Sequence, residues 1–156
     1  MIDENGYRPN VGIIVANSNG SVLWAKRTGQ EAWQFPQGGI KSAESPEDAL
    51  YRELHEEVGL ADEQVEVVGA TKGWLRYKLP RQLLRDNKSS FVGQKQKWFL
   101  LRLISDDSKI NFANSEKPEF DSWQWVSETK PIEIVIDFKK DVYKKALEEL
   151  IPIIKN

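Results

Sequence analysis

The order of apolar and polar residues along the chain predicts a protein that mixes β-strands with two helices. Short apolar runs rich in β-branched and aromatic residues favour strands. They occupy residues 11–16, 21–26, 65–70, 74–79, 97–104 and 122–126. Asn19-Gly20 predicts a tight turn between the first two strands. Gly38 and Gly39 are predicted to open a loop after the apolar run at residues 33–35.

Two segments have the 3.6-residue spacing of amphipathic helices. In the first, Ser45 suits the N-cap, Pro46 suits the first helical position, and Gly59 supplies the end. Its apolar face consists of Leu50, Leu54 and Val58. The second helix spans residues 138–150, and its inner side consists of Val142, Ala146, Leu147 and Leu150. Helices interspersed with strands predict a layered α/β domain with a mixed β-sheet.

The first helix also carries Glu53, Glu56 and Glu57 together on the face next to its apolar side. Like charges at this spacing destabilise a helix by roughly 0.2 to 0.5 kcal/mol per pair, so a partner should offset them. Hard divalent ions such as Mg²⁺ or Mn²⁺ prefer such an all-oxygen ligand set, and they are commonly shared with substrate phosphates. For a generic cluster of three glutamates, a solvated acidic face is the commoner alternative.

Composition and charge limit the classes of function. The 156 residues suit one domain, residues 1–156, and a net charge of -2 gives no overall bias toward nucleic acid. The chain has no Cys and one His, which excludes disulfides, thiolate zinc sites and His-rich metal sites. The start MIDENGYRPN is acidic, and no apolar run approaches the roughly 18 residues of a membrane span. We therefore expect a cytoplasmic protein.

The three glutamates belong to a longer pattern, Gly38-x5-Glu44-x7-Arg52-Glu53-Leu54-His55-Glu56-Glu57-Val58-Gly59-Leu60. This pattern resembles the signature of the Nudix hydrolases. The resemblance implies a Nudix fold, an α/β/α sandwich around a mixed β-sheet, and hydrolysis of a nucleoside diphosphate linked to another group. It also implies Mg²⁺ or Mn²⁺ as the cofactor, with more than one ion per site. The implied metal-binding and catalytic residues are Glu53, Glu56, Glu57, Gly38 and Arg52, the last of which orients the acids. The sequence leaves open which glutamate accepts a proton.

The resemblance extends to WQFPQGG, WLRYKLP, GQKQKWFLL, PEFDSWQWV and FKKDVY. These segments are similar to the branch of the family that removes pyrophosphate from the 5′-triphosphate end of bacterial RNA and so promotes mRNA decay. The similarity implies that Glu119 joins the metal site and that Phe138 stacks on a base. The implied phosphate contacts are Arg8, Arg27, Tyr77 and Lys139. Hydrolases of dinucleoside polyphosphates share much of this pattern, so they stay an alternative. A non-catalytic module that binds nucleotides or RNA is a second one.

The segment from Lys72 to Lys97 is strongly basic, with eight Lys and Arg residues against Asp86. The basic residues are Lys72, Arg76, Lys78, Arg81, Arg85, Lys88, Lys95 and Lys97, and the interleaved aromatic residues are Trp74, Tyr77, Phe91 and Trp98. One interpretation is a groove that binds single-stranded nucleic acid by stacking and charge. The other is a strand edge protected by Lys and Arg, with the rings in the core. The resemblance favours the first.

Overall fold

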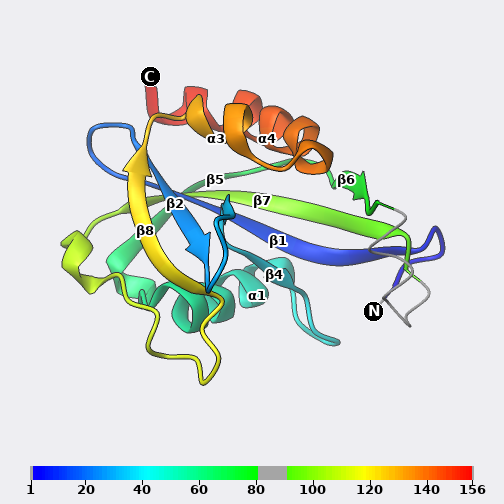
Figure 1. Cartoon of the computed structure of the whole chain (residues 1–156), viewed down its shortest axis with the longest axis horizontal. Coiled ribbons are helices and arrows are strands. Elements are labelled where there is room, and N and C mark those ends of the chain that lie inside the picture. The colour runs from blue at the N-terminus through cyan, green and yellow to red at the C-terminus, as the bar shows by residue number, and fades with distance from the viewer. Residues whose placement is uncertain (1, 81–90, 156) are drawn as a thin grey trace.

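A mixed sheet of eight strands runs through the computed structural model, which describes residues 2–80 and 91–155 (Figure 1). The strands are β1 (Tyr7–Ala16), β2 (Val22–Arg27), β3 (Trp33–Gln34), β4 (Gln37–Gly39), β5 (Val65–Ala70), β6 (Leu75–Lys78), β7 (Gly93–Leu103) and β8 (Phe120–Val126). The α-helices are α1 (Pro46–Glu53), α3 (Lys130–Ile134) and α4 (Asp137–Lys155). Single helical turns follow at Leu54–Val58, Asp62–Gln64 and Asp107–Lys109.

The sheet is built around two long neighbouring strands. β1 and β7 pair in parallel along their whole length, from Tyr7 opposite Gly93 to Ala16 opposite Arg102. The other pairs are antiparallel: β2 and β4 lie against β1, β5 and β6 against β7, and β3 and β8 against β2. This combination confirms the predicted mixed sheet.

Helices cover both faces of the sheet, so the predicted α/β/α arrangement is confirmed. Figure 1 shows α1 on one side of the sheet and α3 with α4 on the other. The core on the α4 side contains Trp24, Phe35, Trp98 and Tyr143, whose rings meet mainly edge to face. The core on the α1 side is mainly aliphatic and includes the predicted face of Leu50, Leu54 and Val58, each fully buried.

Helix α1 begins as the sequence predicts. The Ser45 side chain accepts a hydrogen bond from the Asp48 backbone N–H, and the Asp48 carboxylate accepts one from the Ser45 N–H, which forms a capping box. The helix does not continue as regular α-helix, because residues Leu54–Val58 form a π-helical turn. Gly59 then ends it with a φ of 80°, as expected for a left-handed C-cap.

One sequence prediction about this region was wrong. Gly38 and Gly39 do not open a loop, because they form most of β4 and pair with Val11 and Asn10 of β1. As part of this strand, Gly38 lies close to Glu53 at the end of α1. The strand at residues 65–70 was predicted to the residue, β6 is one residue shorter than predicted at each end, and the other predicted strands and α4 are shifted or extended at their ends. The two-residue β3 and the short α3 were not predicted.

Candidate functional site

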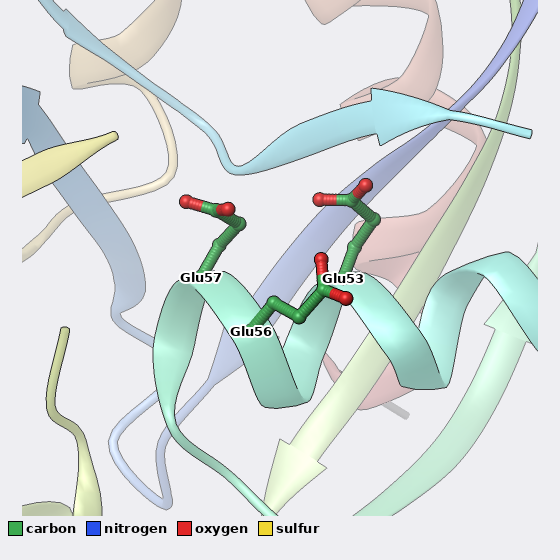
Figure 2. Close-up of side chains that lie close together, drawn as sticks. All are labelled: Glu53, Glu56 and Glu57. Carbon is green, nitrogen blue, oxygen red and sulfur yellow. The ribbon is translucent and has the colours of Figure 1, made fainter. Parts of the chain in front are cut away.

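The three glutamates of the helix gather their carboxylates at one point. One carboxylate oxygen from each of Glu53, Glu56 and Glu57 lies within 4.8 Å of the other two. Figure 2 shows Glu53 and Glu57 rising from the same side of the helix, with Glu56 between them. Glu53 comes from the last residue of α1, and Glu56 and Glu57 come from the π-helical turn. The sequence prediction of a shared acidic face is confirmed.

Arg52 ties this cluster to the segment that precedes the helix. Its Nη1 donates to Glu53 Oε1 over 2.8 Å and lies 3.6 Å from a Glu56 carboxylate oxygen. Its Nε and Nη2 donate to the two carboxylate oxygens of Glu44 over 2.7 and 2.9 Å. Nη2 also donates to the Gly39 carbonyl over 2.8 Å. This forked geometry suits arginine, since lysine has no planar pair of donors.

The backbone of β4 passes directly over Glu53. A Cβ atom added at Gly38 would overlap the Glu53 carboxyl group, whereas one added at Gly39 would meet nothing within 4 Å. Glycine at position 38 therefore follows from the close approach of a strand to a buried carboxylate, and neither glycine has a positive φ.

The electrostatics of the cluster favour a bound cation. Burial raises the pKa of Glu53 and of Glu57, because both carboxylates lose water on folding. Arg52 does not relieve this cost fully, because it also pairs with Glu44 and holds the pKa of that carboxyl at about 2. A set of oxygen donors with too little positive charge around it fits hard divalent ions, and the residues present therefore suit the Mg²⁺ or Mn²⁺ that the resemblance implies.

Glu119 reaches the cluster from the segment before β8. Its backbone N–H donates to Glu57 Oε2 over 3.4 Å, and its own side chain contacts the amide of Gln34. Burial, followed by the negative charge of Glu57, raises the pKa of Glu119 to about 7. The structure therefore brings this fourth carboxylate to the edge of the site, 62 residues along the chain from Glu57.

A cavity of about 630 Å³ opens between β2, β3 and the segment that joins α3 to α4, and its lining includes Gln34, the hydrogen-bond partner of Glu119. Arg27, Phe138 and Lys139 all line it, so three of the five residues expected to contact substrate share one cavity. Lys139 is buried, and burial, followed by the charge of Arg27, lowers its pKa to about 8. Exposed Ile134 and Ile136 form an apolar rim.

The other two expected substrate contacts lie elsewhere. Arg8 lines a second cavity of about 360 Å³ together with Lys41, Arg52 and Glu53. Tyr77 is 7% exposed, its ring packs on Phe138 with centroids 5.7 Å apart, and its hydroxyl accepts from Gln37 Nε2 over 3.4 Å. The acidic cluster thus borders the cavity of Arg8, which Glu53 lines. It is connected to the cavity of Arg27 and Lys139 through Glu119 and its partner Gln34.

The basic segment between Lys72 and Lys97 combines both interpretations of its sequence. Trp98 is fully buried, and Tyr77 and Phe91 are 7% exposed, so these rings belong to the interior and the stacking interpretation was wrong for them. Trp74 is half-buried, and the Nζ atoms of Lys95 and Lys97 lie 4.7 and 5.5 Å from its ring centroid. Lys72, Arg76 and Lys78 are exposed. Four further residues of that prediction, Arg81, Arg85, Asp86 and Lys88, lie outside the described residues.

Buried glutamines near the site were not predicted. Gln34 links Glu119 and Lys139, and Gln96 Nε2 donates to Asn10 over 2.8 Å and to Gln37 over 3.2 Å. The signal in the sequence is polar residues inside apolar runs, such as Gln34 between Trp33 and Phe35. A buried amide has to be hydrogen-bonded, so such a position predicts a specific partner.

Comparisons with known proteins agree with this geometry. The family model of the NUDIX domain matches residues 6–149. An RNA pyrophosphohydrolase of Marinomonas sp. (strain MWYL1) is 61% identical over 153 residues, which cover 97% of this chain and 95% of that protein. An RNA pyrophosphohydrolase of Saccharophagus degradans is 61% identical over 154 residues, which cover 98% and 91% of the two chains.

Solved structures with low sequence identity share the fold. The E. coli dihydroneopterin triphosphate pyrophosphohydrolase is 18% identical with a TM-score of 0.74, covering 94% of this chain and 97% of that one. A C. elegans Ap4A hydrolase in a binary complex is also 18% identical with a TM-score of 0.64, covering 88% and 93%. Among the helices of residues 2–80 and 91–155, none combines the length and apolar character that crossing a bilayer requires.

Proposed function

Because this chain belongs to the Nudix family, we propose that it is an RNA pyrophosphohydrolase, which removes pyrophosphate from the 5′-triphosphate end of RNA and leaves a 5′-monophosphate. Two relatives that are 61% identical over nearly the whole chain carry that name. The observation that carries the proposal is the cluster of three carboxylates, with oxygens within 4.8 Å of one another, together with its two links to basic residues. Glu53 shares a cavity with Arg8, and Glu119 is joined through Gln34 to Lys139 in the cavity that Arg27 also lines.

This arrangement supports a metal site on the helix. Glu53, Glu56 and Glu57 would hold Mg²⁺ or Mn²⁺, and Glu119 and Gly38 would complete a site for more than one ion. When bound, such ions neutralise phosphate charge and promote attack by water. Arg52 keeps the Glu53 carboxylate in place through a 2.8 Å hydrogen bond. The side chain of Glu56 is 43% exposed and comes no closer than 3.6 Å to Arg52, compared with 2.8 Å for Glu53, so it is less restrained than Glu53 and is the first to test as proton acceptor.

The two cavities divide the substrate between them. A triphosphate end carries several negative charges, which Arg8 and Lys139 offset, and these residues enter the site from different cavities. Arg27 and the Phe138 ring offer a guanidinium and an aromatic face to a nucleobase in the 630 Å³ cavity. Stacking of this kind contributes about 1 to 3 kcal/mol per base and suits unpaired RNA.

A comparison of two substrates tests the proposal. Purified protein with Mg²⁺ or Mn²⁺ is incubated with a short triphosphorylated RNA and with diadenosine tetraphosphate, and kcat/KM is measured for each. We expect conversion of the RNA end to a monophosphate with the higher kcat/KM. A higher kcat/KM on the dinucleotide would assign the chain to the dinucleoside polyphosphate hydrolases. RNA binding without turnover of either substrate would make it a non-catalytic module.

A further inference from the structure

Gln34 is a buried amide that stands between two charged groups of the site. It lies in β3 with 4% of its surface exposed. The Lys139 Nζ donates to Gln34 Oε1 over 3.2 Å, and Gln34 Nε2 donates to Glu119 Oε1 over 3.4 Å. Gln34 is 105 residues from Lys139 and 85 residues from Glu119 along the chain, so the three side chains meet only in the folded protein.

The chemistry of the two neighbours fixes the direction of the amide. An ammonium group has three N–H donors and no acceptor, so Lys139 fixes the direction of the amide whether or not Glu119 carries a proton. The carbonyl oxygen of Gln34 therefore has to face Lys139, and its NH₂ group has to face Glu119. The amide carries no charge, so it satisfies one hydrogen-bonding position on each neighbour without neutralising either of them.

The separation matters because a buried ammonium and a buried carboxylate attract each other strongly at low dielectric. A direct ion pair would occupy the groups that the substrate and the metal need. An ammonium has three donors, and among the described residues one is bonded, to Gln34, which leaves two for a phosphate. The Glu119 carboxylate likewise keeps lone pairs for other partners.

The amide is held by rigid surroundings rather than by a flexible loop. Gln34 pairs with Ala25 of β2, and the next residue, Phe35, donates its N–H to the hydroxyl of Tyr143 over 3.1 Å. Tyr143 is fully buried and belongs to α4, one helical turn after Lys139. The helix that carries Lys139 is therefore also hydrogen-bonded to the residue next to Gln34.

We propose that Gln34 is a positioning residue, which keeps Lys139 and Glu119 apart and oriented so that one contacts substrate phosphate and the other contributes to the metal site. This inference rests on the proposed function for the roles of its two neighbours. It adds a residue that lies outside the glutamate motif. The contacts of Gln34 with Lys139 and Glu119 serve the site as well as the stability of the fold.

The first test is a double-mutant cycle that needs no activity. Urea midpoints are measured without metal for wild type, Gln34→Met, Lys139→Met and the double variant. Methionine has nearly the volume of glutamine but cannot hold either neighbour. We expect Gln34→Met to lower the midpoint clearly in the wild-type background and much less in the Lys139→Met background. Equal shifts in both backgrounds would overturn the proposed coupling.

The second test measures positioning in the working protein. Because misplacement of a catalytic group by about 1 Å can cost on the order of 100-fold, we expect Gln34→Met to lower kcat/KM for triphosphorylated RNA at least tenfold. KM should rise through Lys139, and kcat should fall through Glu119. Calorimetry with Mn²⁺ alone should show a dissociation constant at least threefold higher than in wild type. Gln124→Met, at an exposed glutamine of β8, is the matched control with unchanged values.

The outcomes separate this inference from the proposed function. An inactive wild type would reject the proposed function, while the urea cycle would still report whether Gln34 is coupled to Lys139. If Gln34→Met does not fold, Gln34→Glu takes its place, since its added charge pairs with Lys139 and repels Glu119. We expect a raised KM and weaker Mn²⁺ binding in that variant, and wild-type values for both would overturn the inference.

Discussion

Gly38 and Gly39 allow a matched substitution that tests the close approach of β4 to the acidic cluster. Both lie in β4 with ordinary backbone angles, and both pair with β1. A Cβ at Gly38 overlaps the Glu53 carboxyl group, whereas a Cβ at Gly39 enters open space. Gly38→Ala should therefore disturb Glu53, and Gly39→Ala should not.

The expected magnitude comes from the contacts that Glu53 has to give up. Its hydrogen bond to Arg52 is 2.8 Å long and mostly buried, and a bond to a charged group contributes about 1.5 to 3 kcal/mol. An off-rotamer side chain adds about 0.5 to 1.5 kcal/mol. Replacing glycine by alanine returns about 0.4 to 1 kcal/mol through the unfolded chain. Gly38→Ala should thus lower the free energy of unfolding by about 1 to 4 kcal/mol.

Urea unfolding without metal measures this difference, and Mn²⁺ calorimetry measures the consequence for the site. Gly39→Ala is expected to match wild type or to gain up to about 1 kcal/mol, with unchanged Mn²⁺ affinity. Gly38→Ala is expected to bind Mn²⁺ at least tenfold more weakly, because Glu53 is displaced. If both variants unfold at the same urea concentration and bind Mn²⁺ equally, the explanation of Gly38 by its contact with Glu53 is refuted.

Three further substitutions test other parts of the site. Glu56→Gln should bind triphosphorylated RNA normally and turn it over at least about 100-fold more slowly, as separate binding and steady-state assays would show. Lys139→Met should stabilise the protein at pH 7 by about 1 to 3 kcal/mol, because burial lowers the pKa of Lys139 from 10.5 to about 8. The unfolded state binds the proton more tightly, so this gain is complete below pH 8 and fades toward pH 10.5 in urea unfolding. Ala43→Gly should stabilise by about 0.5 to 1 kcal/mol in thermal unfolding, because Ala43 has a φ of 70°.

Each of these expectations has an outcome that contradicts it. Normal turnover by Glu56→Gln would remove that glutamate from the chemistry. A Lys139→Met variant that is less stable than wild type at pH 7, or whose gain persists at pH 10.5, would show that the buried ammonium is not a cost to folding. Ala61→Gly is the control for Ala43, because Ala61 has a φ of -86° and should lose stability.

The carboxylate cluster could be predicted from the sequence because its geometry is local. Residues three and four apart on a helix share a face, and the spacing of Glu53, Glu56 and Glu57 needs no knowledge of the rest of the fold. The π-helical form of the last turn was not predictable in this way. It depends on neighbours distant in sequence, such as Asn111 N–H donating to the Val58 carbonyl and Asn114 Nδ2 donating to the His55 carbonyl.

Contacts between distant segments decided the predictions that failed. Two glycines in sequence are typical of a loop. In the structure they form a strand that pairs with β1, and Gly38 lies too close to the buried Glu53 carboxylate to carry a Cβ atom. The aromatic residues of the basic segment present the same difficulty. Trp74 and Trp98 both flank lysines in the sequence, yet Trp98 packs on Phe35 and Tyr143 in the core and Trp74 is half-buried at the surface.

Lys139 is a residue outside the glutamate motif whose position in the sequence already indicated a buried polar contact. On α4, residues 139, 143, 146 and 150 recur at helical spacing, and the last three are Tyr143, Ala146 and Leu150 of the buried face. Lys139 therefore continues an apolar face with an ammonium group, and Lys is almost never fully buried without a partner. Its partner is Gln34, itself a polar residue inside an apolar run. Two polar residues that interrupt apolar patterns, Gln34 and Lys139, are thus in contact next to Glu119. Buried polar groups of this kind are expected at functional sites, because stability alone would favour apolar residues there.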